Sequence, residues 1–280
     1  MRFEIRACSD LPSYDLAGFL NANNLSFSNL DWFAPSDRFD EPGCFAVIED
    51  QQIKALLAAT PERPAAAWLR FFHAERDGQH EQYFKTLLSQ AKVVLKAMGA
   101  QSLFSLAPYE WLERLLSAEG FKPADNIVTL QRNFSEVNHG STNRQPIIRE
   151  MTYRDMATVE AIDVAAFDPA WQLNHASLKK TYHLSAWHSV ALLEGKIVGY
   201  QMSTSAFDSA HLARLAVDPC WQRRGVGRLL IEDMLETFSA IGINSFSVNT
   251  QASNFQSLSL YQSLGFVRED RDILVMASTL

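Results

Sequence analysis

The sequence has few cysteines and no long apolar run. Three cysteines, Cys8, Cys44 and Cys220, are scattered among 280 residues, and this odd number favours free thiols over a disulfide framework or a zinc site. No run is long and apolar enough to predict a membrane helix. Residues 1–10 carry charges where a secretory signal would have its apolar region. We therefore expect a cytoplasmic protein with neither a membrane segment nor a bound metal.

Basic residues are also fewer than acidic residues. The chain has 25 Lys and Arg residues against 32 Asp and Glu residues, which gives a formal net charge of -7. Nucleic-acid binding needs a basic face, so this balance argues against nucleic acid as the main partner and is compatible with amine substrates. Hydrophobic residues, by contrast, make up 47% of the chain, which is enough for one large or two ordinary domains.

One glycine-rich segment lies between a predicted strand and a predicted helix. An apolar run ending at Val217 indicates a strand, and an amphipathic pattern from Leu229 indicates a helix. Between them, Gln222-Arg-Arg-Gly-Val-Gly227 combines two glycines with two arginines. Glycines let the backbone approach a ligand, and the first N–H groups of a helix have no partner within it. The segment therefore predicts an anion site, typically for phosphate, with a basic surface turn as the structural alternative.

A second block follows downstream. Residues 247–251 are rich in strand-forming residues, Asn254 is a natural helix N-cap, and Gly265 is a typical helix end. Together the two blocks resemble the GNAT superfamily of acetyl-CoA-dependent N-acetyltransferases. Gln222 to Gly227 matches the family's pyrophosphate loop, (Gln/Arg)-x-x-Gly-x-(Gly/Ala). The family's next segment, Asn-x-x-Ala-x-x-x-Tyr-x-x-x-Gly-Phe, is matched at Asn254, Tyr261, Gly265 and Phe266, with Ser257 in place of the usual alanine.

The same succession of predicted strands and helices occurs twice. We expect a degenerate GNAT-like domain over 1–133, a linker over 134–146 and a catalytic domain over 147–280. The expected fold class is mixed α/β: each domain has a mostly antiparallel mixed sheet flanked by helices. The resemblance adds a splayed central strand pair in the second copy. Tandem copies could also replace a family homodimer within one chain, leaving the protein monomeric.

The first copy lacks the residues of the expected site. In place of the phosphate loop it has residues 75–81, with one glycine and three carboxylates that would repel pyrophosphate. Leu116 and Tyr109 stand where Tyr261 and Asn254 stand in the second copy. We expect the first copy to serve as a scaffold, with a wall of the acceptor pocket as the alternative role.

The resemblance implies acetyl-CoA as the cofactor. Its expected contacts are residues of the splayed strand, the loop and the following helix: Leu215, Ala216, Val217, Gln222, Arg223, Arg224, Gly225, Val226, Gly227, Arg228, Asn254 and Ser257. Backbone groups of the splayed strand would pair with the pantetheine arm and the thioester oxygen, as in the family. No metal ligand set is visible in the sequence.

Two residues are candidates for acid and base chemistry. Tyr261 is the expected general acid for the leaving thiolate, and a packed aromatic is its structural alternative. His211 is the candidate base, because members of the family carry glutamate or histidine at this position. Strand alternation would place His211 on one face with Leu215 and Val217, and Arg214 on the other as a structural partner. A strand-end histidine satisfied by a neighbour is the alternative for His211.

The acceptor is expected to be a primary amine. Phe167, Trp171 and Gln172 lie in a segment that often covers the acceptor in this family, and Asn249 and Gln251 are further candidate contacts. We expect a small amine metabolite. A peptide or protein N-terminus is the alternative, since residues 166–171 resemble a loop of the ribosomal-protein N-terminal acetyltransferases. A non-catalytic acyl-CoA-binding module is the alternative of another class.

Overall fold

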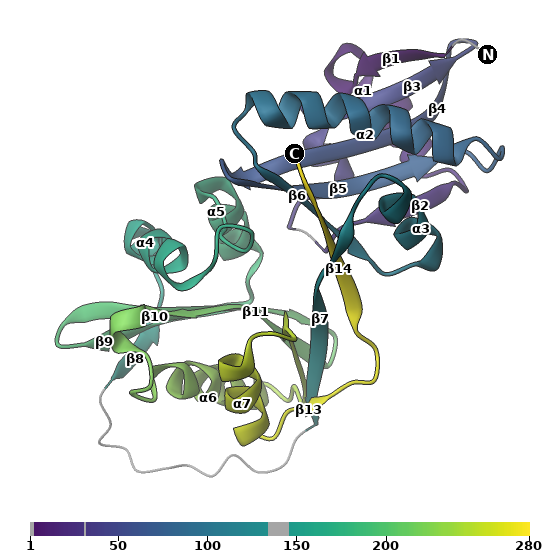
Figure 1. The fold of residues 1–280 in the computed structure, drawn as a ribbon. Helices are drawn as coiled ribbons and strands as arrows, with labels where there is room; N and C mark the ends of the chain where they lie inside the picture. Colours follow the sequence, from purple (N-terminus) through teal and green to yellow (C-terminus); the bar gives the residue numbers. More distant parts are fainter. Residues whose placement is uncertain (1–2, 31, 134–145) are drawn as a thin grey trace. The chain divides into compact units, whose positions relative to one another are not determined.

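The computed structural model describes residues 3–30, 32–133 and 146–280 and divides the chain into two compact units (Figure 1). Unit 1 comprises Met1–Ala124 and Ile273–Leu280, and unit 2 comprises Asp125–Asp272. Both contain a mixed sheet with helices, so the expected α/β class is confirmed. Among the described residues, no helix is long and apolar enough to cross a membrane.

Unit 1 is built on a mixed sheet. Its strand order is β1 (Glu4–Ala7), β3 (Cys44–Glu49), β4 (Gln52–Arg63), β5 (Ala66–Ala74), β6 (Ser102–Ala107) and β14 (Ile273–Thr279). Only β5 and β6 run parallel among these neighbours. A short further strand, β2 (Leu25–Ser28), pairs with β5. The α-helices in the described part of unit 1 are α1 (Ser13–Leu20), α2 (His80–Ala97) and α3 (Glu110–Ala118).

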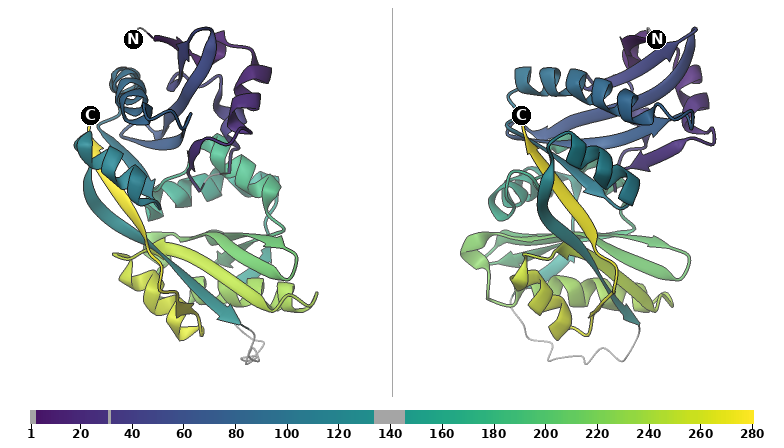
Figure 2. Two further views of the ribbon diagram at one scale, coloured as in Figure 1. Left: turned by 90° about the vertical axis from the view of Figure 1, so that its right-hand side faces the viewer. Right: turned by 45° about the vertical axis from the view of Figure 1, so that its right-hand side comes forward.

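Helices α1 and α2 cover opposite faces of this sheet (Figure 2). Successive strand residues point to opposite faces, and β5 shows this directly. Phe71 packs in one cluster with Leu16 of α1. Phe72 meets Phe84 of α2 edge-on, with ring centroids 5.0 Å apart. The run of fully buried β5 residues therefore serves two helix layers at once.

Unit 2 repeats this plan. Its strand order is β7 (Lys122–Asn133), β12 (Ser245–Gln251), β11 (Ser209–Val217), β10 (Lys196–Ala206), β9 (Trp187–Leu193) and β8 (Ile147–Glu150). Only β11 and β12 run parallel among these neighbours. The two-residue strand β13 (Val267–Arg268) also pairs with β7. The α-helices are α4 (Met156–Ala166), α5 (His175–Leu184), α6 (Val226–Ser239) and α7 (Phe255–Ser263).

Helices α4 and α5 lie on one face of the unit 2 sheet, and α6 and α7 lie on the other (Figure 1). Tyr200 and Met202 of β10 belong to a cluster with residues of α4 and α5. On the other face, Gly199 lets α6 approach closely. A Cβ atom at Gly199 would lie 3.1 Å from Val226 Cγ1 and 3.0 Å from the carbonyl oxygen of Ala216. The start of α6 is thus packed directly on the sheet.

The two units exchange strands. β7 follows α3 of unit 1 along the chain, yet Ile127–Asn133 pairs with β12 of unit 2. β14 follows the last strand of unit 2, yet it pairs with β6 of unit 1. The boundaries expected from the sequence, 1–133 and 147–280, do not show this exchange, because local alternation indicates a strand but not its partner. The expected linker covers residues 134–145, which lie outside the described residues, and Pro146.

Candidate active site

The parallel strands β11 and β12 separate halfway along. Their ladder runs from Ser209 opposite Ser245 to Leu212 opposite Val248. On its other side β11 stays paired with β10 as far as Val217. Among the described residues, 213–217 have no ladder partner on the β12 side, in agreement with the expected splay. Such an exposed edge can pair with an extended ligand.

A β-bulge lies at the point of separation. Arg214 faces Met202 across the β10–β11 ladder, and Leu212 faces Ser203, so Ala213 is one extra residue in β11. A bulge redirects the side chains that follow it. Leu212 packs in the cluster of α6 and α7, whereas Arg214 bonds to Asp163 of α4.

The bulge corrects one expectation about His211. Leu215 and Val217 pack against Leu230 and its neighbours at the start of α6. Leu212, before the bulge, lies on that same side, so the adjacent His211 faces the α4 and α5 side together with Arg214. The expectation that His211 shares a face with Leu215 and Val217 was wrong, because simple alternation does not hold across a bulge.

The loop after β11 ends at an open helix N-terminus. Gln222 Nε2 donates to the carbonyl oxygen of Val217 at 3.1 Å, which holds the loop on the end of the strand. Arg223 and Gly225 adopt left-handed backbone angles, with φ of 60° and 80°. The helical bonding of α6 begins with the N–H of Leu229, which donates to Gly225. The N–H groups of residues 226–228 therefore precede the first helical bond, as an anion site requires.

Arginine side chains surround this helix N-terminus. Arg223 and Arg224 are exposed, and the guanidinium of Arg224 lies 4.8 Å from the ring centre of Trp221. Arg228 Nη2 donates to Ser263 Oγ of α7 at 2.7 Å. This positive charge adds to the positive end of the α6 dipole and favours an anionic ligand.

Helix α7 packs beside the start of α6. A Cβ atom at Gly227 would lie 3.2 Å from Leu260 Cδ2, so the glycine permits the close approach of the two helices. Asn254 Oδ1 accepts a hydrogen bond from the N–H of Ser257 at 3.1 Å, which confirms the expected N-cap. The second motif block therefore fixes the helix that lies against the loop.

Tyr261 is buried in the core on the α6 and α7 side of the sheet. It belongs to the same cluster as Leu212 and Val248, the last paired residues of β11 and β12. Burial raises the pKa of the Tyr261 hydroxyl above its ordinary value. The phenol is therefore protonated at neutral pH, as a proton donor must be.

His211 bonds to the neighbouring strand. Its Nδ1 lies 2.9 Å from Ser247 Oγ of β12. Burial lowers the pKa of His211, so its ring is neutral at neutral pH. This contact is the neighbour that a structural histidine would have, and the neutral ring is the state that a general base needs.

The candidate acceptor residues are engaged in several bonds. Gln172 Nε2 donates to the carbonyl oxygens of Val164 and Phe167, so its amide closes the end of α4. Asn249 Oδ1 accepts from Thr129 Oγ1 of β7 at 3.0 Å. Gln251 Oε1 accepts from the adjacent Thr250 hydroxyl at 3.4 Å. Their role toward a substrate stays a prediction.

The sequence reading missed Asp163, which is fully buried on α4. It accepts hydrogen bonds from Tyr200, Arg214 and the backbone of Leu173. The available signal was an aspartate within the otherwise apolar residues 161–166 of α4, since buried carboxylates are rare unless paired.

In unit 1 other residues of the chain occupy the strand edge and the helix N-terminus that are open in unit 2. Phe71–Ala74 of β5 pairs with β2, which covers the edge that is open in β11. Before helix α2, Asp77 accepts hydrogen bonds from the N–H of Gln79 and from the Tyr83 hydroxyl, both at 2.8 Å. A carboxylate therefore stands at this helix N-terminus, which disfavours a phosphate there.

A protein-family model described as the acetyltransferase (GNAT) domain matches residues 154–275. A curated relative from Escherichia coli, the ribosomal protein bS18-alanine N-acetyltransferase, is 36% identical over 72 residues. That match covers 26% of this chain and 49% of the relative, so the chain spans about half the length of this curated relative.

Solved structures share the whole fold. The tandem GNAT protein from the clavulanic acid biosynthesis pathway superposes with a TM-score of 0.62 at 11% identity, covering 99% of this chain and 98% of that one. A GCN5-related N-acetyltransferase from Sphaerobacter thermophilus gives 0.59 at 14% identity, covering 99% and 95%. These likenesses extend the comparison of the fold over both units.

Proposed function

Because residues 154–275 match the family model of the acetyltransferase (GNAT) domain, we propose that the protein is an acetyl-CoA-dependent N-acetyltransferase whose site lies in unit 2. One observation carries the proposal: the open edge of β11 is followed, after the loop over residues 218–225, by the N-terminus of α6. An extended thioester-bearing arm that ends in a pyrophosphate fits this combination of strand edge and anion site.

The chain offers binding groups for the pyrophosphate, the pantetheine arm and the thioester of acetyl-CoA, which would supply the acetyl group. The N–H groups of residues 226–228 would hold the pyrophosphate, with Arg223 and Arg224 adding charge. The free edge of β11 at Leu215 and Val217 would pair with the pantetheine arm. A backbone N–H on this edge would also stabilise charge that develops on the thioester oxygen, a contribution typically worth about 3 kcal/mol.

Tyr261 and His211 are assigned the two proton transfers. The protonated Tyr261 hydroxyl, in the core cluster that includes the last paired residues of β11 and β12, gives its proton to the departing thiolate. The neutral His211 ring takes a proton from the acceptor ammonium, directly or through a water molecule. The lowered pKa of His211 keeps one ring nitrogen unprotonated at neutral pH.

The acceptor is a primary amine, and two kinds are proposed. A small amine metabolite is the acceptor that we expect from the sequence. A protein or peptide amine is favoured by the curated relative, whose name specifies an alanine of ribosomal protein bS18. A panel that contains both kinds distinguishes them.

The test is release of free thiol from acetyl-CoA across small amines and alanine-starting peptides. We expect turnover on one acceptor class, and we expect Tyr261→Phe and His211→Ala each to lower kcat about a hundredfold. Leu184→Ala, an exposed change at the end of α5, is the control that keeps full activity.

A coenzyme that binds with no turnover on any acceptor would contradict the enzyme. It would support the alternative of a non-catalytic acyl-CoA-binding module. Tyr261→Phe would then leave coenzyme binding unchanged.

A further inference from the structure

Arg214 and Asp163 connect the open strand to the loop between α4 and α5. Arg214 is the first residue after the bulge, and Asp163 lies three residues before the end of α4. Arg214 Nε donates to Asp163 Oδ2 at 2.8 Å, and Arg214 Nη2 lies 2.6 Å from the same oxygen. The carboxylate is fully buried, and the Arg214 side chain is 13% exposed. This ion pair is therefore shielded from solvent.

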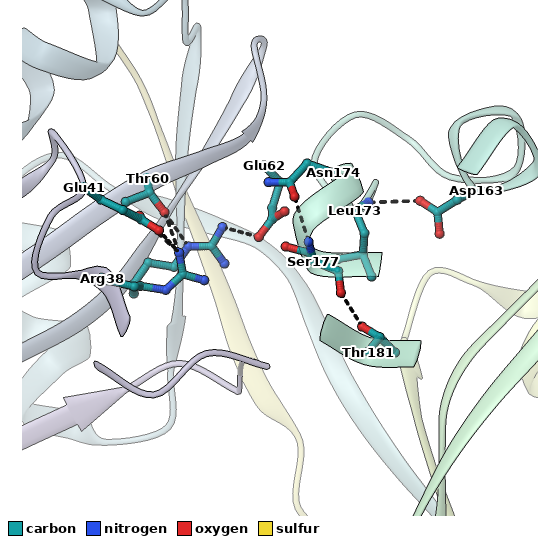
Figure 3. A network of polar contacts seen from close by, with 10 residues as sticks. Arg38, Glu41, Thr60, Glu62, Asp163, Leu173, Asn174, Ser177 and Thr181 are labelled. Carbon is teal, nitrogen blue, oxygen red and sulfur yellow. Dashed lines mark hydrogen bonds and ion pairs between the residues drawn. The ribbon is translucent and has the colours of Figure 1, made fainter. Parts of the chain in front are cut away.

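The same two residues hold both ends of the loop over residues 167–173. Arg214 Nη2 donates to the carbonyl oxygen of Trp171 at 2.8 Å. Its guanidinium carbon lies 3.6 Å from the centre of the Phe167 ring, in cation–π contact. The other oxygen of Asp163 accepts from the N–H of Leu173 at 2.9 Å, as Figure 3 shows. The loop is thus bonded at its start, its middle and its end.

Further bonds fix the carboxylate from the sheet and continue into the next helix. The Tyr200 hydroxyl of β10 donates to Asp163 Oδ2 at 2.5 Å. Asn174, directly after the loop, caps α5 by accepting from the N–H of Ser177 at 2.8 Å, as drawn in Figure 3. The loop therefore has little freedom while the ion pair is intact. Removing one partner of a buried ion pair is strongly destabilising, because the other charge is left buried without a partner.

We propose that Arg214 and Asp163 are positioning residues that set which acceptor amine reaches the site. The inference rests on the proposed function. Arg214 lies within residues 213–217 of β11, which have no ladder partner on the β12 side in the described part of the chain and would hold the thioester, so the loop is held at the same stretch of strand. An acceptor that approaches from the α4 and α5 face must pass this loop. The contacts of Arg214 and Asp163 with residues 167–173, called the clamp below, act on the acceptor. The phosphate loop and α6, on the other face, act on the coenzyme.

The chain offers a matched control pair on the same helix. Arg149 of β8 pairs with Asp155, at the N-terminal end of α4, through two bonds of 2.7 and 2.8 Å. This pair anchors α4 but bonds to no residue of the 167–173 loop among the contacts described. Arg149→Gln therefore tests what the loss of an ion pair on α4 does without releasing the loop.

The experiment compares Arg214→Gln, Arg214→Lys and Arg149→Gln by steady-state kinetics. We expect Arg214→Gln to raise the KM for the acceptor about tenfold or more, and to leave the KM for acetyl-CoA within about twofold. Arg214→Lys keeps the charge but loses the planar fork, so only partial rescue is expected. Arg149→Gln should change neither KM. Equal effects of Arg214→Gln and Arg149→Gln, or an equal rise of both KM values, would overturn the proposal.

Hydrogen exchange supplies a second readout that needs no turnover. Arg214→Gln should speed amide exchange in residues 168–173, and Arg149→Gln should not. Unchanged exchange in Arg214→Gln would overturn the clamp. Faster loop exchange in a protein that acetylates no acceptor would overturn the role in acceptor choice and the proposed function, and would leave the clamp established.

Discussion

The strands β5 and β11 occupy the same place in their units but differ in whether one edge is paired. Each runs parallel to one neighbour at its start, β6 or β12, and each then has a one-residue bulge, at Arg70 or Ala213. Beyond the bulge, β5 is covered by β2, whereas β11 has no partner on that edge in the described part of the chain. Both copies therefore keep two parallel strands that separate, and only in unit 1 does another strand, β2, pair with the edge that this separation exposes.

The helix that follows shows the same contrast. Asp77 stands before α2, three residues ahead of its first residue, where unit 2 has Arg223 before α6. In both helices three N–H groups precede the first helical bond, but at α2 the Asp77 carboxylate accepts from the N–H of Gln79 just before them. Unit 1 is therefore closed to an anionic extended ligand in two independent ways.

The largest effect is expected from Phe27→Ala in β2. Phe27 is 1% exposed and faces Phe72 across the ladder, and the loss of a buried phenylalanine typically costs about 3–5 kcal/mol. Thermal unfolding should show a strong loss of stability. Calorimetry should still find one acetyl-CoA per chain, because Asp77 remains. Two bound molecules would mean that β2 alone had excluded the ligand from unit 1.

Arg223→Asp makes the α6 loop resemble that of unit 1. The change removes a cation and places an anion at the helix N-terminus. Together these changes should weaken the free energy of phosphate binding by about 2–3 kcal/mol. The Kd for acetyl-CoA should rise about a hundredfold, measured by calorimetry. Arg223→Gln is the control and should show a smaller rise. Unchanged affinity in Arg223→Asp would contradict the assignment of this loop.

Asp77→Asn tests the cap in unit 1. Asparagine can still accept from the N–H of Gln79, so the expected loss of stability is below about 1 kcal/mol by thermal unfolding. Acetyl-CoA turnover and affinity should not change. A gain of coenzyme binding in this variant would show that Asp77 is the main barrier.

The smallest effect is expected in the pH profile. Burial lowers the pKa of His211 below its ordinary value of 6.5, so the neutral ring persists as the pH falls through 6.5. The acid limb of kcat/KM should therefore lie below pH 6.5. His211→Trp copies Trp68, which holds the position two residues before the bulge of β5. This variant should lose the limb, and an unaltered limb would assign it to another group.

The sequence predicted local features well. The loop over residues 222–227 lies at the strand-to-helix junction as expected, and Asn254 caps α7. Both depend on residues close together in the chain, where glycine freedom and N-cap chemistry decide the geometry.

Features that depend on distant partners were not predicted. The bulge at Ala213 reverses the expected face of His211, and it is visible only in the register with β10. The cover of β5 by β2 joins residues more than forty positions apart, such as Leu25 and Ala74. Asp163 and Arg214, 51 residues apart, meet only once α4 lies on the sheet. Strand partners and register are set by packing, which a linear pattern does not encode.

The strand exchange has a consequence for the order in which the protein is made. Unit 1 takes β14, from Ile273–Thr279, as the neighbour of β6, so its sheet is incomplete while unit 2 is being synthesised. Unit 2 already has β7 when its own strands emerge. Unit 2 can therefore complete its sheet before β14 is synthesised, whereas unit 1 cannot. Unit 2 is one continuous segment of the chain, Asp125–Asp272, whereas unit 1 is assembled from two segments that are far apart in the sequence.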